Sequence, residues 1–206
     1  SSRSIIIGAI VVTIVLSLVV PSATARTACV VPIMMGVIAA FKVDKHSRLA
    51  ASMMIVIAQA TSIWNVGIQT SSAQNLLSIG FINKTFGAGH SVSWLDWLLA
   101  GAPWSLTMSV ILYFLARKLL PPETEAVEGG SEAIKKALAE LGPTTGKEKR
   151  LIGISLLLLL FWSTGGKLHS IDTTSVTLAG LAIMLLPGIG VMSWKEVEKR
   201  VQWGTL

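Results

Sequence analysis

The sequence predicts an all-α transmembrane protein, and three observations lead to this class. Charged residues make up 14% of the 206 residues, against roughly 25% in an average soluble domain. The charges leave six uncharged windows, at 4–25, 27–41, 49–83, 97–116, 151–166 and 173–194. Several windows approach or exceed the about 20 residues that cross a bilayer as a helix, whereas a barrel strand needs only about 10 alternating residues. We therefore expect a multi-pass helical membrane protein.

The first two windows predict a helical hairpin. Residues 4–41 hold one charge, Arg26, and basic residues flank them on both sides, which makes both flanks cytoplasmic by the positive-inside rule. One continuous helix of this length would measure about 57 Å, nearly twice the hydrocarbon thickness. We expect a re-entrant hairpin over 4–41 with its tip at 21–26. Irregular backbone inside a membrane is tolerated only in a protein interior or a watery cavity, so the tip is a candidate site.

The third window predicts a discontinuous helix. Residues 49–83 would form a helix of about 52 Å, which is also too long to cross the membrane once. The run 65–75 is rich in Ser, Asn and Gln and contains a glycine, so we expect the helix to break there. Trp64 lies beside this break, and we expect it to line the break.

The rest of the chain predicts a loop, three further spans and a linker. We expect a loop at 84–90 and a descending span over 97–116. A basic cytoplasmic linker, 119–149, would follow, with a short helix over 132–141 that Ser131 caps. Two more spans are expected at 151–166 and 173–191. The clusters of Lys and Arg all fall on one side of this topology, which supports it.

Individual residues at the span ends are given structural roles. Asp96 and Asp172 are expected to cap helices or to lie at the interface. Six of the seven tryptophans fall near span ends, as in an aromatic belt: Trp94, Trp97, Trp104, Trp162, Trp194 and Trp203.

Composition and motifs exclude several classes of function. The net charge of +6 and the pI near 9.7 follow from the loop residues that set topology, so we expect no nucleic-acid partner. The single cysteine, Cys29, excludes a disulfide framework and a thiolate metal site. His46, His90 and His169 fall in loops beside charges, and a solvated surface role is favoured over a metal site. No paired nucleophile and base is present, so we expect neither an enzyme nor a cofactor.

The two polar breaks are the remaining candidates for function. Amino-terminal ends of broken helices present unpaired N–H groups that suit an anion, and carboxyl-terminal ends present C=O groups that suit Na⁺. Only a hairpin arm, a basic turn and a half helix separate the breaks, so they can meet near the midplane. Arg26 is costly inside a membrane unless it is paired, which makes it a functional candidate.

The tip and the motifs that follow it resemble one known family. Pro21-Ser22-Ala23-Thr24-Ala25-Arg26 resembles the Ser-Asn-Thr hairpin tip of the divalent anion/sodium symporter family, especially its dicarboxylate and citrate translocator branch. The run 62–75 is similar to that family's Gly-rich loop, with Gly67 and Asn75 matching. Further similar features are Ser93-Trp94-Leu95-Asp96-Trp97, Pro121-Pro122-Glu123, Leu141-Gly142-Pro143, Lys147-Glu148-Lys149-Arg150 and His169-Ser170-Ile171-Asp172.

The resemblance implies an architecture and a division of the chain. In the family, two inverted repeats each supply a hairpin and a broken helix to a mobile transport domain, and a scaffold domain forms a homodimer. Residues 1–91 would then be half of a transport domain and 92–118 a transmembrane span. Residues 119–149 would be the linker, and 150–206 two scaffold spans that open the second repeat. The chain is expected to be a fragment of a multi-pass protein of a bacterial inner membrane.

The resemblance also implies site residues, which we combine with the argument from the breaks. Substrate contacts are expected from Ser22, Ala23, Thr24, Arg26 and Asn75. Sodium contacts are expected from Ser22, Thr24, Asn65, Gly67 and Ser72. The chain departs from the family pattern at Ala23, where the family has Asn, and at Trp64-Asn65 and Ala73-Gln74, which replace its usual glycines and prolines.

These inferences together predict secondary transport of anionic solutes. The expected cargo is a di- or tricarboxylate or another divalent anion. Transport would be coupled to sodium or to counter-substrate exchange and would work by alternating access, in a homodimer embedded in membrane lipid. The alternative is an anion channel or a sodium-independent transporter-like membrane protein. A membrane enzyme and a purely structural subunit rank below both.

Overall fold

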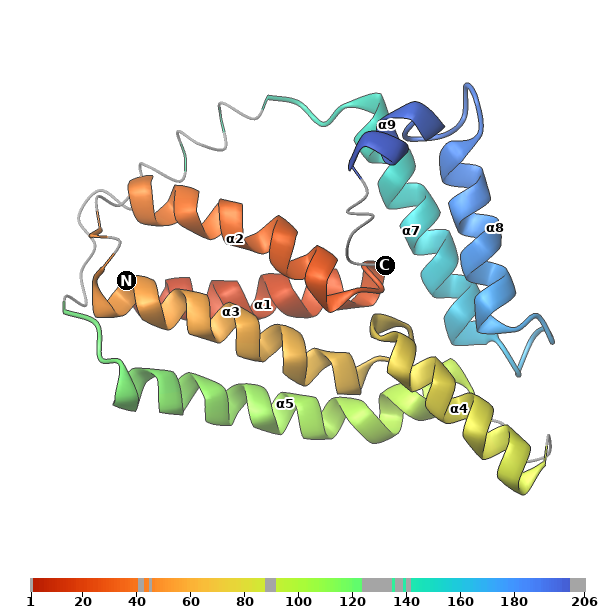
Figure 1. Ribbon diagram of the computed structural model, residues 1–206, viewed down its shortest axis with the longest axis horizontal. Helices are drawn as coiled ribbons and strands as arrows, with labels where there is room; N and C mark the ends of the chain where they lie inside the picture. The colour runs from red at the N-terminus through yellow and green to blue at the C-terminus, as the bar shows by residue number, and fades with distance from the viewer. Residues whose placement is uncertain are drawn as a thin grey trace. The chain divides into compact units, whose positions relative to one another are not determined.

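The computed structural model describes residues 2–40, 43–44, 46–87, 92–123, 135, 139 and 142–200 (Figure 1). All named elements of this described part are helices. The chain divides into two compact units, residues 1–142 and 143–206, which are described separately. The all-helical class predicted from the sequence is therefore observed.

The first unit begins with a helical hairpin. Helix α1 (Ser2–Val19) and helix α2 (Ala23–Ala40) run antiparallel, and Val20, Pro21 and Ser22 join them (Figure 1). The Ser22 hydroxyl accepts a hydrogen bond from the Ala25 N–H at 3.3 Å, which caps the first turn of α2. Each arm has 18 residues, about 27 Å of helix. The break expected over 21–26 is therefore confined to the start of that range, because α2 already begins at Ala23.

The broken helix lies where the sequence predicts it. Helix α3 (Arg48–Gly67) ends at a short 3-10 turn, η1 (Gln69–Ser71), and helix α4 (Ala73–Phe86) resumes the path. The residues on either side of η1, Ile68 and Ser72, have extended backbone. The discontinuity therefore occupies 68–72, inside the expected run 65–75. The loop expected at 84–90 was placed too early, since α4 continues to Phe86.

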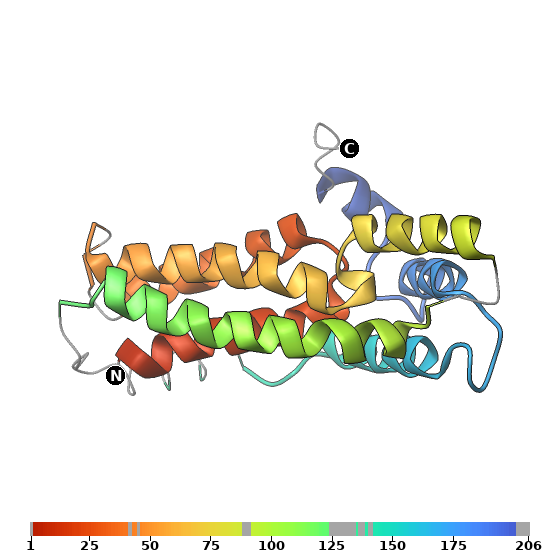
Figure 2. The ribbon, with the colours of Figure 1, turned by 90° about the horizontal axis from the view of Figure 1, so that it is seen from below.

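Helix α5 (Trp94–Leu119) runs alongside α3 (Figure 2). Ser93 and Asp96 form a reciprocal capping box at its start, which confirms the capping role expected of Asp96. The helix begins three residues earlier than the uncharged window, because a capped first turn accommodates an acidic side chain.

A shared apolar core holds the first unit together. Helices α1, α2, α3 and α5 all contribute buried side chains to one cluster. Burial of such surface is the main favourable term where helices pack away from water, and close contact between side chains replaces it inside lipid. The buried members include Ile6, Ile10, Val30, Met34, Ile38, Met53, Val56, Ile57 and Leu112.

The second unit contains helix α7 (Gly146–Thr164), helix α8 (Thr173–Leu185) and helix α9 (Trp194–Arg200). Asp172 accepts a hydrogen bond from the Ser175 N–H and caps α8, as expected. The span expected over 173–191 is wrong in its extent, because α8 ends at Leu185. Pro187 and Gly188, with a φ of 82°, turn the chain there.

Three of the described helices are long and apolar enough to cross a membrane: α1, α3 and α5. The spans expected at 151–166 and 173–191 are not among them. Helix α8 has 13 residues, about 20 Å, and α7 carries four charged residues in its first turns. The helix expected over 132–141 lies outside the described residues apart from Lys135 and Ala139, as does its cap Ser131.

The tryptophans do not form the uniform belt that we expected. Trp104 and Trp194 are exposed, but Trp94 and Trp162 are only 5% and 3% exposed. The belt interpretation is therefore wrong for these two buried side chains, and Trp203 lies outside the described residues.

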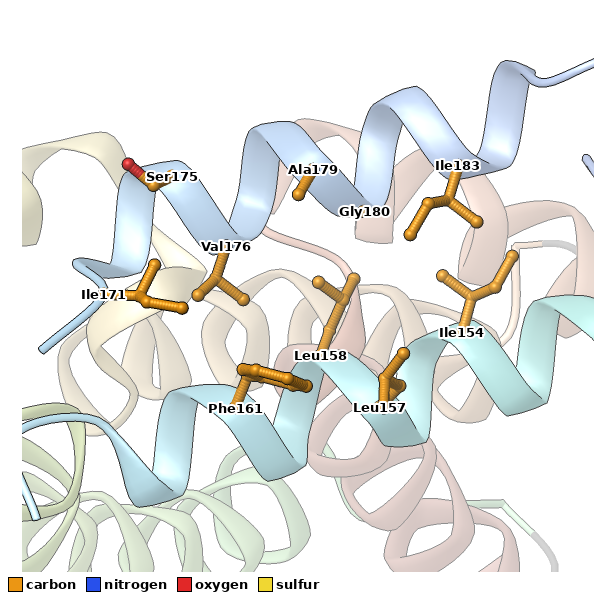
Figure 3. A pocket seen from close by; sticks show the side chains of 10 residues that line it. All are labelled: Ile154, Leu157, Leu158, Phe161, Ile171, Ser175, Val176, Ala179, Gly180 and Ile183. Atoms are coloured by element: carbon orange, nitrogen blue, oxygen red, sulfur yellow. The ribbon is translucent and has the colours of Figure 1, made fainter. Parts of the chain in front are cut away.

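A cavity of about 190 Å³ opens between α7 and α8 (Figure 3). Its lining is apolar except for Ser175, whose hydroxyl donates to the Asp172 carboxylate at 2.6 Å. An anion there would lose its hydration without gaining a hydrogen-bond donor, so this cavity does not suit the expected cargo. The lining residues are Ile154, Leu157, Leu158, Phe161, Ile171, Ser175, Val176, Ala179, Gly180 and Ile183.

Candidate functional site

The carboxyl-terminal end of α3 is closed by side chains of the break itself. The Ser71 hydroxyl donates to the carbonyl oxygens of Trp64 and Asn65, at 2.9 and 3.1 Å. The Asn75 amide donates to the carbonyl oxygens of Asn65 and Ile68, at 2.6 and 2.9 Å. Carbonyls that a helix break frees must find donors when they are buried. We expected unpaired carbonyls here, and the structure instead shows them accepting hydrogen bonds from neighbouring side chains.

Helix α5 supplies further donors to the same end of α3. The Trp97 indole N–H donates to the Val66 carbonyl at 2.8 Å. The Ser105 hydroxyl donates to the Ile63 carbonyl at 3.0 Å. Carbonyl oxygens each have two lone pairs, so they can accept these bonds, which orient the Val66 and Ile63 carbonyls. The break is therefore fixed from two sides.

Close approach of backbone allows α5 to reach the break. A Cβ atom on Gly67 would lie 2.5 Å from the Ser105 hydroxyl, and one on Gly101 would lie 3.0 Å from the Val66 carbonyl oxygen. Larger residues at either glycine would push the helices apart. Gly67 therefore has a packing role at the crossing of α3 and α5, beside the sodium role that the resemblance implies.

Trp64 lies in this crossing and does not line the break. It is 4% exposed, and its indole N–H donates to the Ser109 hydroxyl of α5 at 3.0 Å. The expectation that Trp64 lines the polar break is wrong, because its ring packs between the two helices.

The hairpin tip is tied to the end of α3 by Arg26. This side chain is fully buried, at 0% exposure. Its guanidinium donates to the Val20 carbonyl at 3.3 Å, to the Thr61 carbonyl at 3.4 Å and to the side-chain oxygen of Asn65. The two breaks that are about 40 residues apart in sequence are thus brought together, as the sequence predicted.

The charge of Arg26 is not balanced by an acid in the described part of the chain. Its acceptors there are two backbone carbonyls and one amide, all neutral. Its Nε atom is buried and has no hydrogen-bond partner among the described residues. An isolated buried charge costs several kcal/mol. A positive potential therefore persists at the meeting point of the two breaks, next to the amino-terminal end of α2.

The predicted site residues fall into two groups around this meeting point. At the tip, Ser22 and Ala23 are half-buried and Thr24 is exposed. At the α4 side, Ser72 is half-buried, its hydroxyl donates to the Gln74 side chain, and no side chain caps the amino end of α4.

The predicted ligands Asn65 and Asn75 already have partners within the protein. Both Asn75 donor bonds go to backbone carbonyls, and the Asn65 side-chain oxygen accepts from Arg26. The substrate and sodium assignments of all these residues remain predictions. No cluster of three or more His, Cys, Asp or Glu side chains suited to a metal occurs among the described residues.

Sequence reasoning missed the residues that hold the break. Ser71 and Thr70 were part of the polar run without an assigned role, and Trp94 was attributed to the belt. The polar residues beside Trp94, which form a capping box at a helix start, are a signal that it lies in a structured turn. Its hydrogen-bond partner, Thr70, is 24 residues away, and the sequence gives no sign of that contact.

Comparison with known proteins identifies the family. The model of the sodium:sulfate symporter transmembrane region matches residues 1–206. A protein named as a membrane protein of Cupriavidus necator is 63% identical over the whole chain. The inner membrane protein YbhI and the citrate/succinate antiporter of Escherichia coli are 32% and 30% identical, over 94% and 96% of the chain.

The matched region is a part of each relative. The chain spans about 40% of the length of these three proteins. The family consists of transporters and not of enzymes, and the chain is integral to the membrane, with several spanning helices. The resemblance found at the hairpin tip is confirmed: the chain belongs to the family of the sodium:sulfate symporter transmembrane region.

Proposed function

We propose that this chain forms one half of the cargo site of a longer secondary transporter for di- or tricarboxylates. The observation that carries the proposal is the buried guanidinium of Arg26, whose acceptors among the described residues are all neutral, at the junction of two helix breaks. An anion with two carboxylates suits this positive potential. Relatives named as citrate/succinate and L-tartrate/succinate antiporters support this class of cargo.

The half-site would hold one carboxylate of the cargo. The expected donors are the Ser22 and Thr24 hydroxyls and the amino end of α4 at Ser72, which no side chain caps. Asn75 would contribute through its side-chain oxygen, because its N–H groups are engaged. The second carboxylate would be bound by residues that this chain does not include. By the resemblance, the α1–α2 hairpin is re-entrant and an inverted repeat supplies the other tip.

Coupling is proposed to use either Na⁺ or exchange for a second anion. The family description supports sodium, and the names of several relatives support exchange. Sodium would bind to the oxygens of Ser22, Thr24, Asn65, Gly67 and Ser72. The longer protein would work as a homodimer by alternating access, in a bacterial inner membrane such as that of its relative YbhI.

The test is uptake of labelled succinate and citrate by the full-length protein in proteoliposomes. Uptake driven by an inward Na⁺ gradient identifies a symporter, and uptake that requires internal dicarboxylate identifies an exchanger. Uptake that follows only the membrane potential, with no saturation, identifies the alternative, an anion channel. If neither anion is taken up under any of these conditions, the proposal fails.

Replacement of Arg26 tests the observation on which the proposal depends. Arg26→Gln removes the charge and keeps amide donors, whereas Arg26→Lys keeps the charge. Loss of one buried charge interaction worth about 3 kcal/mol corresponds to roughly a 150-fold change in affinity. We expect Arg26→Gln to raise KM at least tenfold and Arg26→Lys to raise it less. Equal KM values for the wild type and Arg26→Gln would exclude the guanidinium as the source of anion binding.

A further inference from the structure

Trp94 at the start of α5, and Val92 just before it, form hydrogen bonds with the short turn η1 in the middle of the broken helix. The Trp94 indole N–H donates to the Thr70 hydroxyl at 3.2 Å. The Gln69 side-chain amide donates to the Val92 carbonyl at 3.3 Å. Trp94 and Thr70 are each 5% exposed, and Gln69 is 1% exposed. The Trp94–Thr70 hydrogen bond therefore joins two buried side chains, and both hydrogen bonds join segments more than 20 residues apart in sequence.

The turn η1 has little support from its own backbone. It comprises three residues, and the extended residues Ile68 and Ser72 separate it from α3 and α4. Within it, the Ser71 N–H donates to the Ile68 carbonyl at 3.1 Å. Short 3-10 turns have poorer hydrogen-bond geometry than α-helices, and a single turn is marginal without outside contacts. Side-chain contacts, those from α5 among them, therefore help to fix the conformation of this segment.

We propose that Trp94 is a positioning residue for the cargo site, acting through Thr70. The inference rests on the proposed transport function. Neither residue is among the predicted ligands of cargo or sodium. Their hydrogen bond fixes η1 and thereby the direction in which α4 begins, with its uncapped amino end at Ser72. Cargo binds to the ordered form of the break, so the apparent affinity falls in proportion when the ordered fraction falls.

The experiment removes this hydrogen bond from each side in the full-length protein. Trp94→Phe keeps an aromatic ring and removes the N–H, and Thr70→Val keeps the shape and removes the acceptor. Thr70→Ser restores a hydroxyl and serves as the conservative variant. Trp104→Phe is the matched control on the same helix, because Trp104 is 47% exposed whereas Trp94 is 5% exposed.

We expect the two disrupting variants to behave alike in succinate uptake. A net hydrogen-bond contribution of about 1 kcal/mol corresponds to roughly a fivefold change in an equilibrium. The KM should rise about fivefold in Trp94→Phe and in Thr70→Val, with Vmax changed less than twofold. The double variant should be no more than about twofold worse than either single one, because both remove the same interaction. Thr70→Ser and Trp104→Phe should match the wild type.

Hydrogen exchange of the backbone amides at 68–72 provides a readout that does not depend on transport. Exchange there should accelerate by about fivefold or more in both disrupting variants and in neither control. Unchanged exchange, or faster exchange without a change in KM, would overturn the positioning role. If the wild-type protein moves no anion, the proposed function fails. The exchange rates then decide by themselves whether the Trp94–Thr70 hydrogen bond orders η1.

Discussion

The two helix breaks of the first unit are held in different ways. The break at 68–72 is buried, and donors from Ser71, Asn75 and α5 close the end of α3. The hairpin tip at 20–22 is partly exposed, and its backbone bonds stay within the hairpin. In the described structure, the hydrogen bonds between the tip and α3 all come from Arg26.

This difference indicates that the two halves of the site have different mobility. A segment with many buried hydrogen bonds opens only with a large part of the fold, whereas a segment tied by one side chain can open locally. We therefore expect the α3–α4 break to act as a fixed wall and the tip to be the part that adjusts if cargo binds there as proposed. Substitutions that loosen the wall should cost more stability than substitutions at the tip.

The largest effect is expected from Gly67→Ala, at the crossing of α3 and α5. The new methyl group would lie 2.5 Å from the Ser105 hydroxyl and 3.0 Å from its Cβ, and so short a side chain cannot swing away easily. Overpacking of this kind costs roughly 1–3 kcal/mol. We expect a clear decrease in the thermal unfolding midpoint of the purified full-length protein.

Gly80→Ala is the matched control on α4, where a Cβ atom meets nothing within 4 Å. There the substitution should raise stability by up to about 1 kcal/mol, because alanine favours helix. If both variants have the same midpoint, the close crossing does not fix the break.

An intermediate effect is expected when one polar side chain is shortened at each break. Asn75→Ala removes two donor bonds from a buried side chain to backbone carbonyls, and Ser22→Ala removes one part-buried capping bond. At about 1 kcal/mol for each bond, Asn75→Ala should cost about twice as much as Ser22→Ala. Thermal unfolding measures both costs. A tip variant that is the more destabilising of the two would contradict the assignment of the α3–α4 break as the fixed wall.

The smallest effect is expected at the opposite end of α3, where an exposed contact replaces the buried ones. The Glu123 carboxylate accepts from the Arg48 N–H at 2.6 Å and from the Leu49 N–H at 3.4 Å, and it lies 3.5 Å from the Arg48 side chain. The Arg48 backbone bond is the main cause that lowers the pKa of Glu123 below its ordinary value of about 4.5.

The lowered pKa fixes the sign of the pH dependence. A carboxyl group with a lower pKa in the folded state stabilises the fold above the unfolded-state pKa. This contribution is lost as the pH falls below about 4.5 and through the folded-state pKa. The midpoint difference between the wild type and Glu123→Gln should therefore be present at pH 7 and should vanish below that window. If the midpoint difference grows on acidification, Glu123 does not stabilise the start of α3 through these hydrogen bonds.

Much of the helix pattern could be predicted from the sequence, because charge-free windows and positive flanks report directly on the lipid environment. The hairpin, the break in the third window and the caps Asp96 and Asp172 all follow from local residues. The end of α8 was missed even though Pro187 marks it, because the uncharged window continued past the proline. Charge alone does not locate the end of a helix.

The candidate site was only partly predictable. Polar residues in apolar windows identify where helices break, and Arg26 stands out because a charge in lipid is costly. Their partners are set by the packing of α3 against α5 and against the hairpin. The side-chain donors of Trp94, Trp97 and Ser105 lie 24 to 42 residues from their acceptors, a separation that no local pattern encodes.

The sequence by itself determined that the chain lies in a membrane, that its helices break twice and that a cationic side chain, Arg26, lies at one break. Hydrophobicity and charge are properties of each residue, so they survive without a fold. Only the tertiary structure decided that Arg26 faces neutral acceptors and that α5 closes the second break. These facts depend on which helices touch, and contact between distant segments is settled by packing.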